Sequence, residues 1–147
     1  MPEGVAERAL QALYAALSSA LPVGAVLERN SALPLRIPPG GLMILRDGDP
    51  GDPQVILSPL RYDYDHMAEL DIHAGNPDQA ARDATFDTLK RSVALALQVD
   101  RSLGGLADDL RARAPRALLI KPIDGATEIK AATIPIIITY VTDDPLT

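Results

Sequence analysis

The chain has 147 residues, the length of a single domain with one hydrophobic core. Hydrophobic residues make up 47% and charged residues 23%, a balance typical of globular proteins and not of disordered or fibrous ones. With no cysteine, a net charge of −6 and 3% aromatic residues, the chain lacks disulfides, cysteine zinc sites, the basic clusters that grip DNA, and base-stacking platforms.

The negative charge is concentrated in one part of the sequence. Residues 41–75 contain seven acids and only two bases, Arg46 and Arg61, whereas residues 1–40 and 76–114 are each neutral. We therefore look for the functional surface of the protein in residues 41–75.

The N-terminal residues predict an amphipathic helix from Pro2 or Glu3 to about Leu21, ended by Pro22 and Gly24. Acids near the start and spaced apolar residues do not fit a secretory signal, and no run of about 18 apolar residues predicts a membrane span. We expect a protein that stays in the compartment where it is made.

Residues 25–29 predict one short strand, and residues 42–57 predict a β-hairpin. Its strands would be Leu42 to Leu45 and Val55 to Leu57, and the Gly, Pro and Asp cluster between them favours turns. Three of those acids, Asp47, Asp49 and Asp52, raise the alternative of a calcium loop. The twelfth position of such a loop needs a bidentate Glu and holds Ser58 here, so we interpret the segment as a turn.

Residues 62–73 alternate between two kinds of side chain, as expected for a long strand with one buried face and one solvated acidic face. The predicted buried face carries Tyr62, Tyr64, His66, Ala68, Leu70 and Ile72. The other face carries Asp63, Asp65, Met67, Glu69, Asp71 and His73.

The two histidines of this strand raise the question of a metal site. His66 stands in a mostly apolar row, so we interpret it as an interior or interface histidine with satisfied hydrogen bonds. The best metal set would be Glu69, Asp71 and His73, but successive same-face residues lie about 7 Å apart, too wide for one ion without further ligands. We predict no metal and no cofactor.

The sequence Asn76-Pro77-Asp78-Gln79 predicts the start of a helix, with Asn76 as the cap and Pro77 at the first helical position. The helix should end before Gly104-Gly105, with a buried stripe of Phe86, Leu89, Val93 and Leu97. A second short helix is expected over residues 106–113.

The C-terminal part predicts a strand hairpin with its turn at Asp124-Gly125, followed by a long β-branched strand. Pro135 within that strand favours an edge position or a bulge, because proline has no N–H for a sheet ladder. The expected fold class is α+β, with an antiparallel sheet of four to five strands and two main helices packed on one face. The whole chain, residues 1–147, is expected to form one domain.

The chain contains no nucleophile elbow, P-loop, dinucleotide fingerprint or HExxH motif. In KPIDGATEIK, the residues Asp124, Glu128 and Lys130 are similar to the magnesium-binding acids and lysine of restriction-type nucleases. Here they flank one tight hairpin, and an acidic chain does not favour a polyanionic substrate. We interpret the segment as a charged hairpin tip and the protein as one without catalytic residues.

The order of predicted elements resembles that of the tail-terminator (tail-completion) proteins of long-tailed bacteriophages, prophages and gene transfer particles. The segment RIPPGGLMILRDGDPGDPQVILSPLRYDYDH, residues 36–66, is similar to short proteins encoded in prophage tail cassettes. The resemblance implies a structural virion protein that assembles in the host cytoplasm. In that family a ring, typically a hexamer, ends the tail tube and joins it to the head connector or stopper protein while double-stranded DNA passes through.

For this sequence we predict that an acidic strand face lines the lumen of such a ring, because like charge lets DNA slide past without binding. The predicted lumen-facing residues are Asp63, Asp65, Glu69 and Asp71. Two alternatives stay open at this point: a head-completion or stopper protein of the neck, and a small metal-dependent enzyme such as a nuclease.

Overall fold

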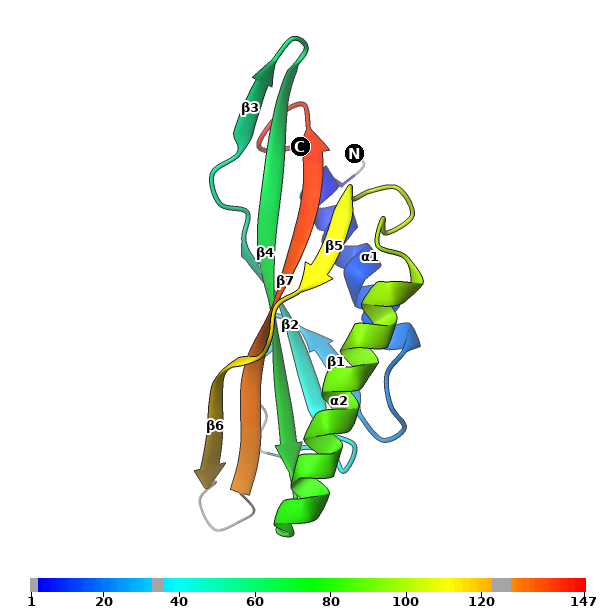
Figure 1. The fold of residues 1–147 in the computed structure, drawn as a ribbon, viewed down its shortest axis with the longest axis vertical. Coiled ribbons are helices and arrows are strands. Elements are labelled where there is room, and N and C mark those ends of the chain that lie inside the picture. Colours follow the sequence, from blue (N-terminus) through cyan, green and yellow to red (C-terminus); the bar gives the residue numbers. More distant parts are fainter. Residues whose placement is uncertain (1–2, 33–35, 123–127) are drawn as a thin grey trace.

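The structure is a computed structural model, and it describes residues 3–32, 36–122 and 128–147. One twisted sheet carries both helices on the same face (Figure 1). The predicted α+β class with two main helices is therefore confirmed. The elements in chain order are α1 (Val5–Ser19), β1 (Val26–Arg29), β2 (Leu42–Asp49), β3 (Gln54–Leu57), β4 (Leu60–Gly75), α2 (Gln79–Val99), β5 (Asp109–Ala112), β6 (Arg116–Pro122) and β7 (Glu128–Thr142).

The described sheet has seven strands and is mixed, which corrects the prediction of four to five antiparallel strands. The strand order is β1-β2-β4-β7-β5, with β3 also paired to β4 and β6 also paired to β7. The pair β1–β2 is parallel, and the other described pairs are antiparallel. The number is larger because β4 and β7, of 16 and 15 residues, each accept short strands along different parts of their length.

The hairpin predicted over residues 42–57 is wrong. Strand β2 lies between β1 and β4, and β3 instead forms a hairpin with β4 through the turn at Ser58-Pro59, whose peptide bond is cis. The Gly, Pro and Asp cluster therefore covers the end of β2 and the short connection to β3, which carries the chain along β4 from beside Met67 to beside Asp63. Turn residues located the connection correctly but could not identify which strands pair.

Strand β7 as a whole lies inside the sheet, which corrects the edge position predicted from Pro135, but at Pro135 itself the side of β7 away from β4 has no strand partner. Pro135 is opposite Glu69 of β4, and its carbonyl accepts a hydrogen bond from the Arg113 N–H at 2.9 Å. Strand β5 pairs with residues 136–139 and β6 with residues 128–133 of β7, so Pro135 falls where β5 has ended and β6 has not begun. A missing N–H on that side removes no ladder bond. The predicted turn at Asp124-Gly125 lies outside the described residues.

Helix α2 begins two residues later than the sequence analysis proposed. Asp78, not Asn76, is the N-cap, and its carboxylate accepts a hydrogen bond from the Ala81 N–H at 3.2 Å. Asn76 instead accepts from the Asp78 N–H at 2.9 Å and shapes the turn before the helix. The short helix predicted over residues 106–113 is also wrong, since β5 occupies this region and pairs with β7.

The hydrophobic core lies between the helices and one face of the sheet, which we call the inner face. It combines the apolar stripes of α1 and α2 with alternate residues of β4 and β7, including Leu70, Ile72, Ile134, Ile136 and Ile138. The opposite face, the outer face, carries the odd-numbered residues of β4. Some of it is also covered, since Leu42 and Ile44 of β2 point outward by register and are buried.

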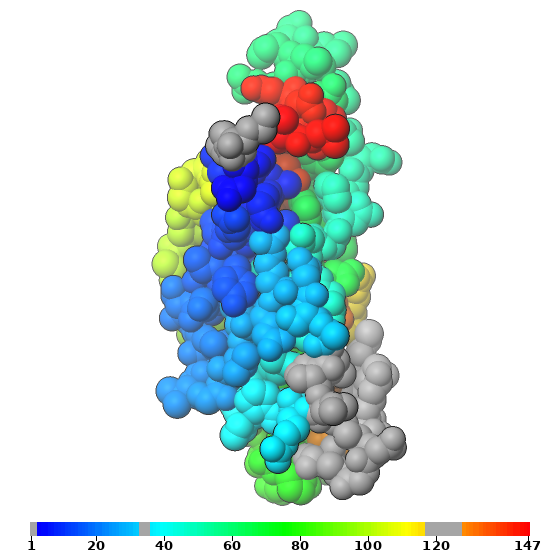
Figure 2. Space-filling model, turned by 180° about the vertical axis from the view of Figure 1, so that it is seen from behind, coloured from blue at the N-terminus to red at the C-terminus, as the bar shows by residue number. Residues whose placement is uncertain are grey.

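The molecule is elongated, and one end is formed by the β3–β4 hairpin. In the view from behind, these teal and green residues extend beyond the C-terminal residues in red (Figure 2). We call residues 54–61 the hairpin arm. Its side chains from Gln54 to Arg61 are exposed throughout.

Candidate functional site: the acidic row of β4

The four predicted acids lie on one face of β4, as the alternation indicated. Side chains at Tyr64, His66, Ala68, Leu70, Ile72 and Ala74 are buried on the inner face, whereas those between them are half-buried or exposed on the outer face. We call Asp63, Asp65, Glu69 and Asp71 the acidic row. Whether this row faces the lumen of a ring remains a prediction.

Two acids, Glu69 and Asp71, form the lower half of the acidic row, towards the C-terminal end of β4, and arginines neutralise them. The Asp71 carboxylate accepts from Arg46 Nε at 2.7 Å and from the Thr133 hydroxyl at 2.8 Å. Glu69 accepts from Arg116 at 3.2 Å. These partners come from three different strands, so the two acids hold β4 to its neighbours across the outer face.

The other two acids, Asp63 and Asp65, form the upper half of the row and keep their negative charge. Asp65 is exposed and accepts a hydrogen bond from the Thr139 hydroxyl at 2.6 Å, which satisfies one oxygen without removing charge. Within residues 3–32, 36–122 and 128–147, neither Asp63 nor Asp65 forms an ion pair. Two of the four acids, and not all four as the sequence suggested, therefore carry a charge that no described cation balances.

Asp47, first considered for calcium, belongs instead to an ion-pair network. Arg29 donates to Glu7 at 2.8 Å and to Asp47 at 2.9 Å, and Asn30 adds a bond to Asp47 at 3.0 Å. Partial burial opposes ionisation of Asp47, but the bonds from Asn30 and Arg29 outweigh it and lower the pKa of this carboxyl. The bond to Glu7 raises the pKa of Arg29. Because Arg29 lies on β1, Glu7 on α1 and Asp47 on β2, these bonds connect the three elements.

His66 is a buried histidine with both ring nitrogens bonded, which confirms the structural interpretation. Its Nε2 lies 2.6 Å from the Asp47 carbonyl, and its Nδ1 lies 2.9 Å from the Tyr140 hydroxyl. Since a carbonyl can only accept, Nε2 carries the proton and Nδ1 accepts from Tyr140. The Asp47 carbonyl reaches inward at an irregularity of β2 where Gly48 has φ +70° and a Cβ would lie 2.0 Å from the Met67 carbonyl. Burial, with a smaller contribution from nearby Tyr64, raises the pKa of Tyr140 to about 12.

The metal set considered from the sequence has other partners. Glu69 and Asp71 bind Arg116 and Arg46, so their carboxylates are engaged by guanidinium groups. Across the part of the chain that the structure describes, no three His, Asp or Glu side chains converge as an ion would require.

The nuclease-like residues hold α2 against β7 where they are described. Glu128 pairs with Arg82 at 3.3 Å, and Lys130 pairs with Asp83 at 3.1 Å while lying 4.7 Å above the Phe86 ring. Asp124, the third member, lies outside the described residues. Both described residues thus have structural partners on one helix.

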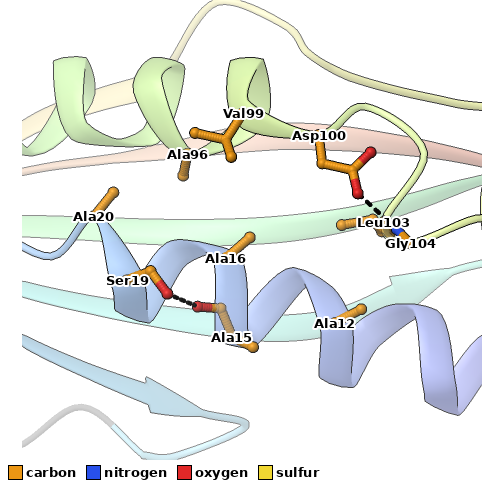
Figure 3. A pocket seen from close by; sticks show the side chains of 10 residues that line it. All are labelled: Ala12, Ala15, Ala16, Ser19, Ala20, Ala96, Val99, Asp100, Leu103 and Gly104. Carbon is orange, nitrogen blue, oxygen red and sulfur yellow. Dashed lines mark hydrogen bonds between the residues drawn. The ribbon is translucent and has the colours of Figure 1, made fainter.

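An apolar groove between the helices was missed by the sequence analysis. It lies where the C-terminal ends of α1 and α2 approach each other, has a volume of about 420 Å³, and is lined mainly by alanines (Figure 3). Its sequence signal is the run of alanines on α1. The lining residues used below are Ala16, Ala20, Ala96, Val99, Asp100 and Leu103.

None of the described helices is long and apolar enough to cross a membrane. The sequence matches no protein-family model and no curated protein.

Proposed function

We propose that the protein is a structural component of a phage or phage-like tail, forming a ring at the end of the tail tube through which DNA passes. The observation that carries the proposal is the upper half of the acidic row, where Asp63 and Asp65 stay uncompensated on the outer face of the longest strand. A passage for DNA must be wetted and must not bind phosphates, and fixed negative charge meets both needs.

The division of the acidic row supports this role. Glu69 and Asp71 form ion pairs with Arg116 and Arg46, and these pairs hold the neighbouring strands to β4. Asp63 and Asp65 are placed on that fixed support without a cation of their own. A charged surface on rigid strands keeps its spacing when it is repeated around a ring.

Reversing the charge of the upper row tests the proposal. In particles that carry Asp63→Lys/Asp65→Lys in place of the wild type, tails should assemble, but DNA delivery should fall by at least about tenfold because lysines bind the passing phosphates. Electron microscopy of the tails and counts of DNA-delivering particles measure the two properties separately.

The matched control is Glu3→Lys/Asp108→Lys, which makes the same change in net charge at two exposed acids, before α1 and before β5, that form no ion pair among the described residues. This control should deliver DNA as the wild type does. Normal delivery by the Asp63→Lys/Asp65→Lys particles would contradict the lumen assignment. Particles in which the protein is absent from the tail end would contradict the proposed function itself.

A further inference from the structure

The hairpin arm presents apolar side chains that touch little of their own chain. Val55, Ile56, Leu57 and Leu60 are all exposed, with Leu57 at 77%. By register, Leu57 is opposite Leu60 and Val55 is opposite Tyr62, so these residues share one face of the two-stranded ribbon. A cluster of large aliphatic side chains on an isolated hairpin is typical of a contact surface.

The groove between α1 and α2 is a second exposed apolar surface. Ala16 and Ala20 of α1 face Ala96 and Val99 of α2 across it, and Leu103 closes one end (Figure 3). Val99 is 85% exposed, and the neighbouring Leu95 is 61% exposed. Small side chains on both walls leave room for larger aliphatic side chains from outside.

The arm and the groove cannot meet within one chain. Figure 1 shows the arm at one tip of the sheet and the helices along the opposite side, with the C-terminal end of α2 well below the arm. Two different surfaces that fit each other on separate copies make a head-to-tail contact, which closes into a ring when the rotation between copies divides a full turn.

The charges at the two surfaces are complementary. Arg61, opposite Ile56 and one pair from the turn of the arm, is exposed and, among the described residues, has no acidic partner. Among the described residues, Asp100 at the end of the groove accepts bonds only from the neutral groups of Ser102 and Gly104. An uncompensated cation on the arm thus matches an uncompensated anion beside the groove.

We propose that the tip of the hairpin arm of one copy enters the helix groove of the next copy, with Leu57 and Leu60 among the alanines and Arg61, on the other face of the ribbon, at the rim of the groove near Asp100. This contact rests on the proposed ring, because it supplies the head-to-tail interface that a ring needs. The arm borders the acidic row, since Gln54 pairs with Asp63, but Leu57 and Leu60 lie on the opposite face of the ribbon from Asp63 and Asp65, so each set can be altered without the other.

The lack of cysteine in the sequence makes a direct test possible. In the variant Leu57→Cys/Ala16→Cys, mild oxidation with oxidised glutathione should link arm to groove and give a ladder of covalent oligomers on a non-reducing denaturing gel. The matched control is Leu57→Cys/Ala84→Cys, whose second cysteine lies on the exposed N-terminal half of α2, outside the groove. It should give no ladder at the same protein concentration.

A second variant separates this contact from the proposed function. Leu57→Asp/Leu60→Asp changes only exposed side chains, so its melting temperature should match the wild type while its self-association, followed by sizing chromatography and negative-stain microscopy, is lost. Rings that persist in this variant, or equal cross-linking in the Ala84→Cys control, would overturn the arm-in-groove contact and leave the ring intact. A wild-type protein that forms no ring, alone or at the tail end of particles, would overturn the ring and the contact together.

Discussion

Along β4, even-numbered residues from Tyr64 to Ala74 are buried beneath the helices, whereas odd-numbered residues on the outer face include the four acids. The buried side chains are fixed by packing, and a change there alters the core. The outer side chains divide further, since Glu69 and Asp71 are bound by arginines and Asp63 and Asp65 are not. β4 thus carries three kinds of side chain: buried, ion-paired and unpaired. Substitutions should lower the free energy of unfolding most at the buried positions, less at the ion-paired acids and least at the unpaired acids.

The largest effect is expected on the inner face. Leu70 is fully buried at the centre of the core, so Leu70→Ala should lower the free energy of unfolding by about 2–5 kcal/mol through lost burial and a residual cavity. Urea unfolding followed by circular dichroism measures the change. The matched truncation Met67→Ala, at a half-buried position of the outer face, should cost clearly less. Equal costs would show that the two faces are not distinct in packing.

The polar pair inside the core should come next. Tyr140→Phe leaves His66 Nδ1 buried without its donor, which should cost about 1–3 kcal/mol in unfolding free energy. The double variant with His66→Leu should lose less than the sum of the two single changes, because the orphaned nitrogen is then removed. Additive losses would contradict the bond between these side chains.

The same tyrosine predicts a loss of stability in alkali. Its pKa is raised to about 12 in the folded protein from the usual 10.0, so the folded state holds this proton where the unfolded state has released it. Its contribution is therefore complete below pH 10 and is lost as the pH rises towards 12. Urea midpoints measured across this window should fall less steeply in Tyr140→Phe than in the wild type.

The paired half of the acidic row should show a smaller effect. Asp71→Asn weakens the charged bond from Arg46 on a partly exposed surface and should cost about 1 kcal/mol in unfolding free energy. High salt should reduce this difference between wild type and variant. A difference that is independent of salt would indicate that packing, and not the ion pair, carries the effect.

The sequence predicted those elements whose signal is local. Alternation over residues 62–73 identified β4 and both of its faces, and the apolar spacing around Phe86 and Leu89 identified α2. The cap was misplaced from Asp78 to Asn76 because both side chains accept local N–H groups, and only the backbone geometry distinguishes the turn from the helix.

Features that depend on contacts between distant residues were not predictable from local patterns. Asp71 and Glu69 looked solvated because their arginines lie 25 and 47 residues away in the sequence. Strand β5 has four residues and owes its conformation to pairing with β7, so its own sequence carried too little signal to exclude a helix. The local pattern assigns β3 to a different hairpin, and the exposure of the hairpin arm is evident only once β3 is placed at the end of β4.

The smallest effect on stability is expected at Asp63 and Asp65, and it distinguishes their role from that of the paired acids. Asp63→Asn/Asp65→Asn should change the unfolding free energy by no more than about 0.5 kcal/mol, since no described cation is lost and the amide introduced at position 65 can still accept from Thr139. Urea unfolding beside Asp71→Asn provides the comparison. If the double variant lost as much as Asp71→Asn, the upper acids would be part of the structural network, and the proposed lumen would need another source of negative charge. If the loss is negligible, folding gives no reason for two adjacent outward acids on β4, and their charge is free to act on what passes in front of the strand.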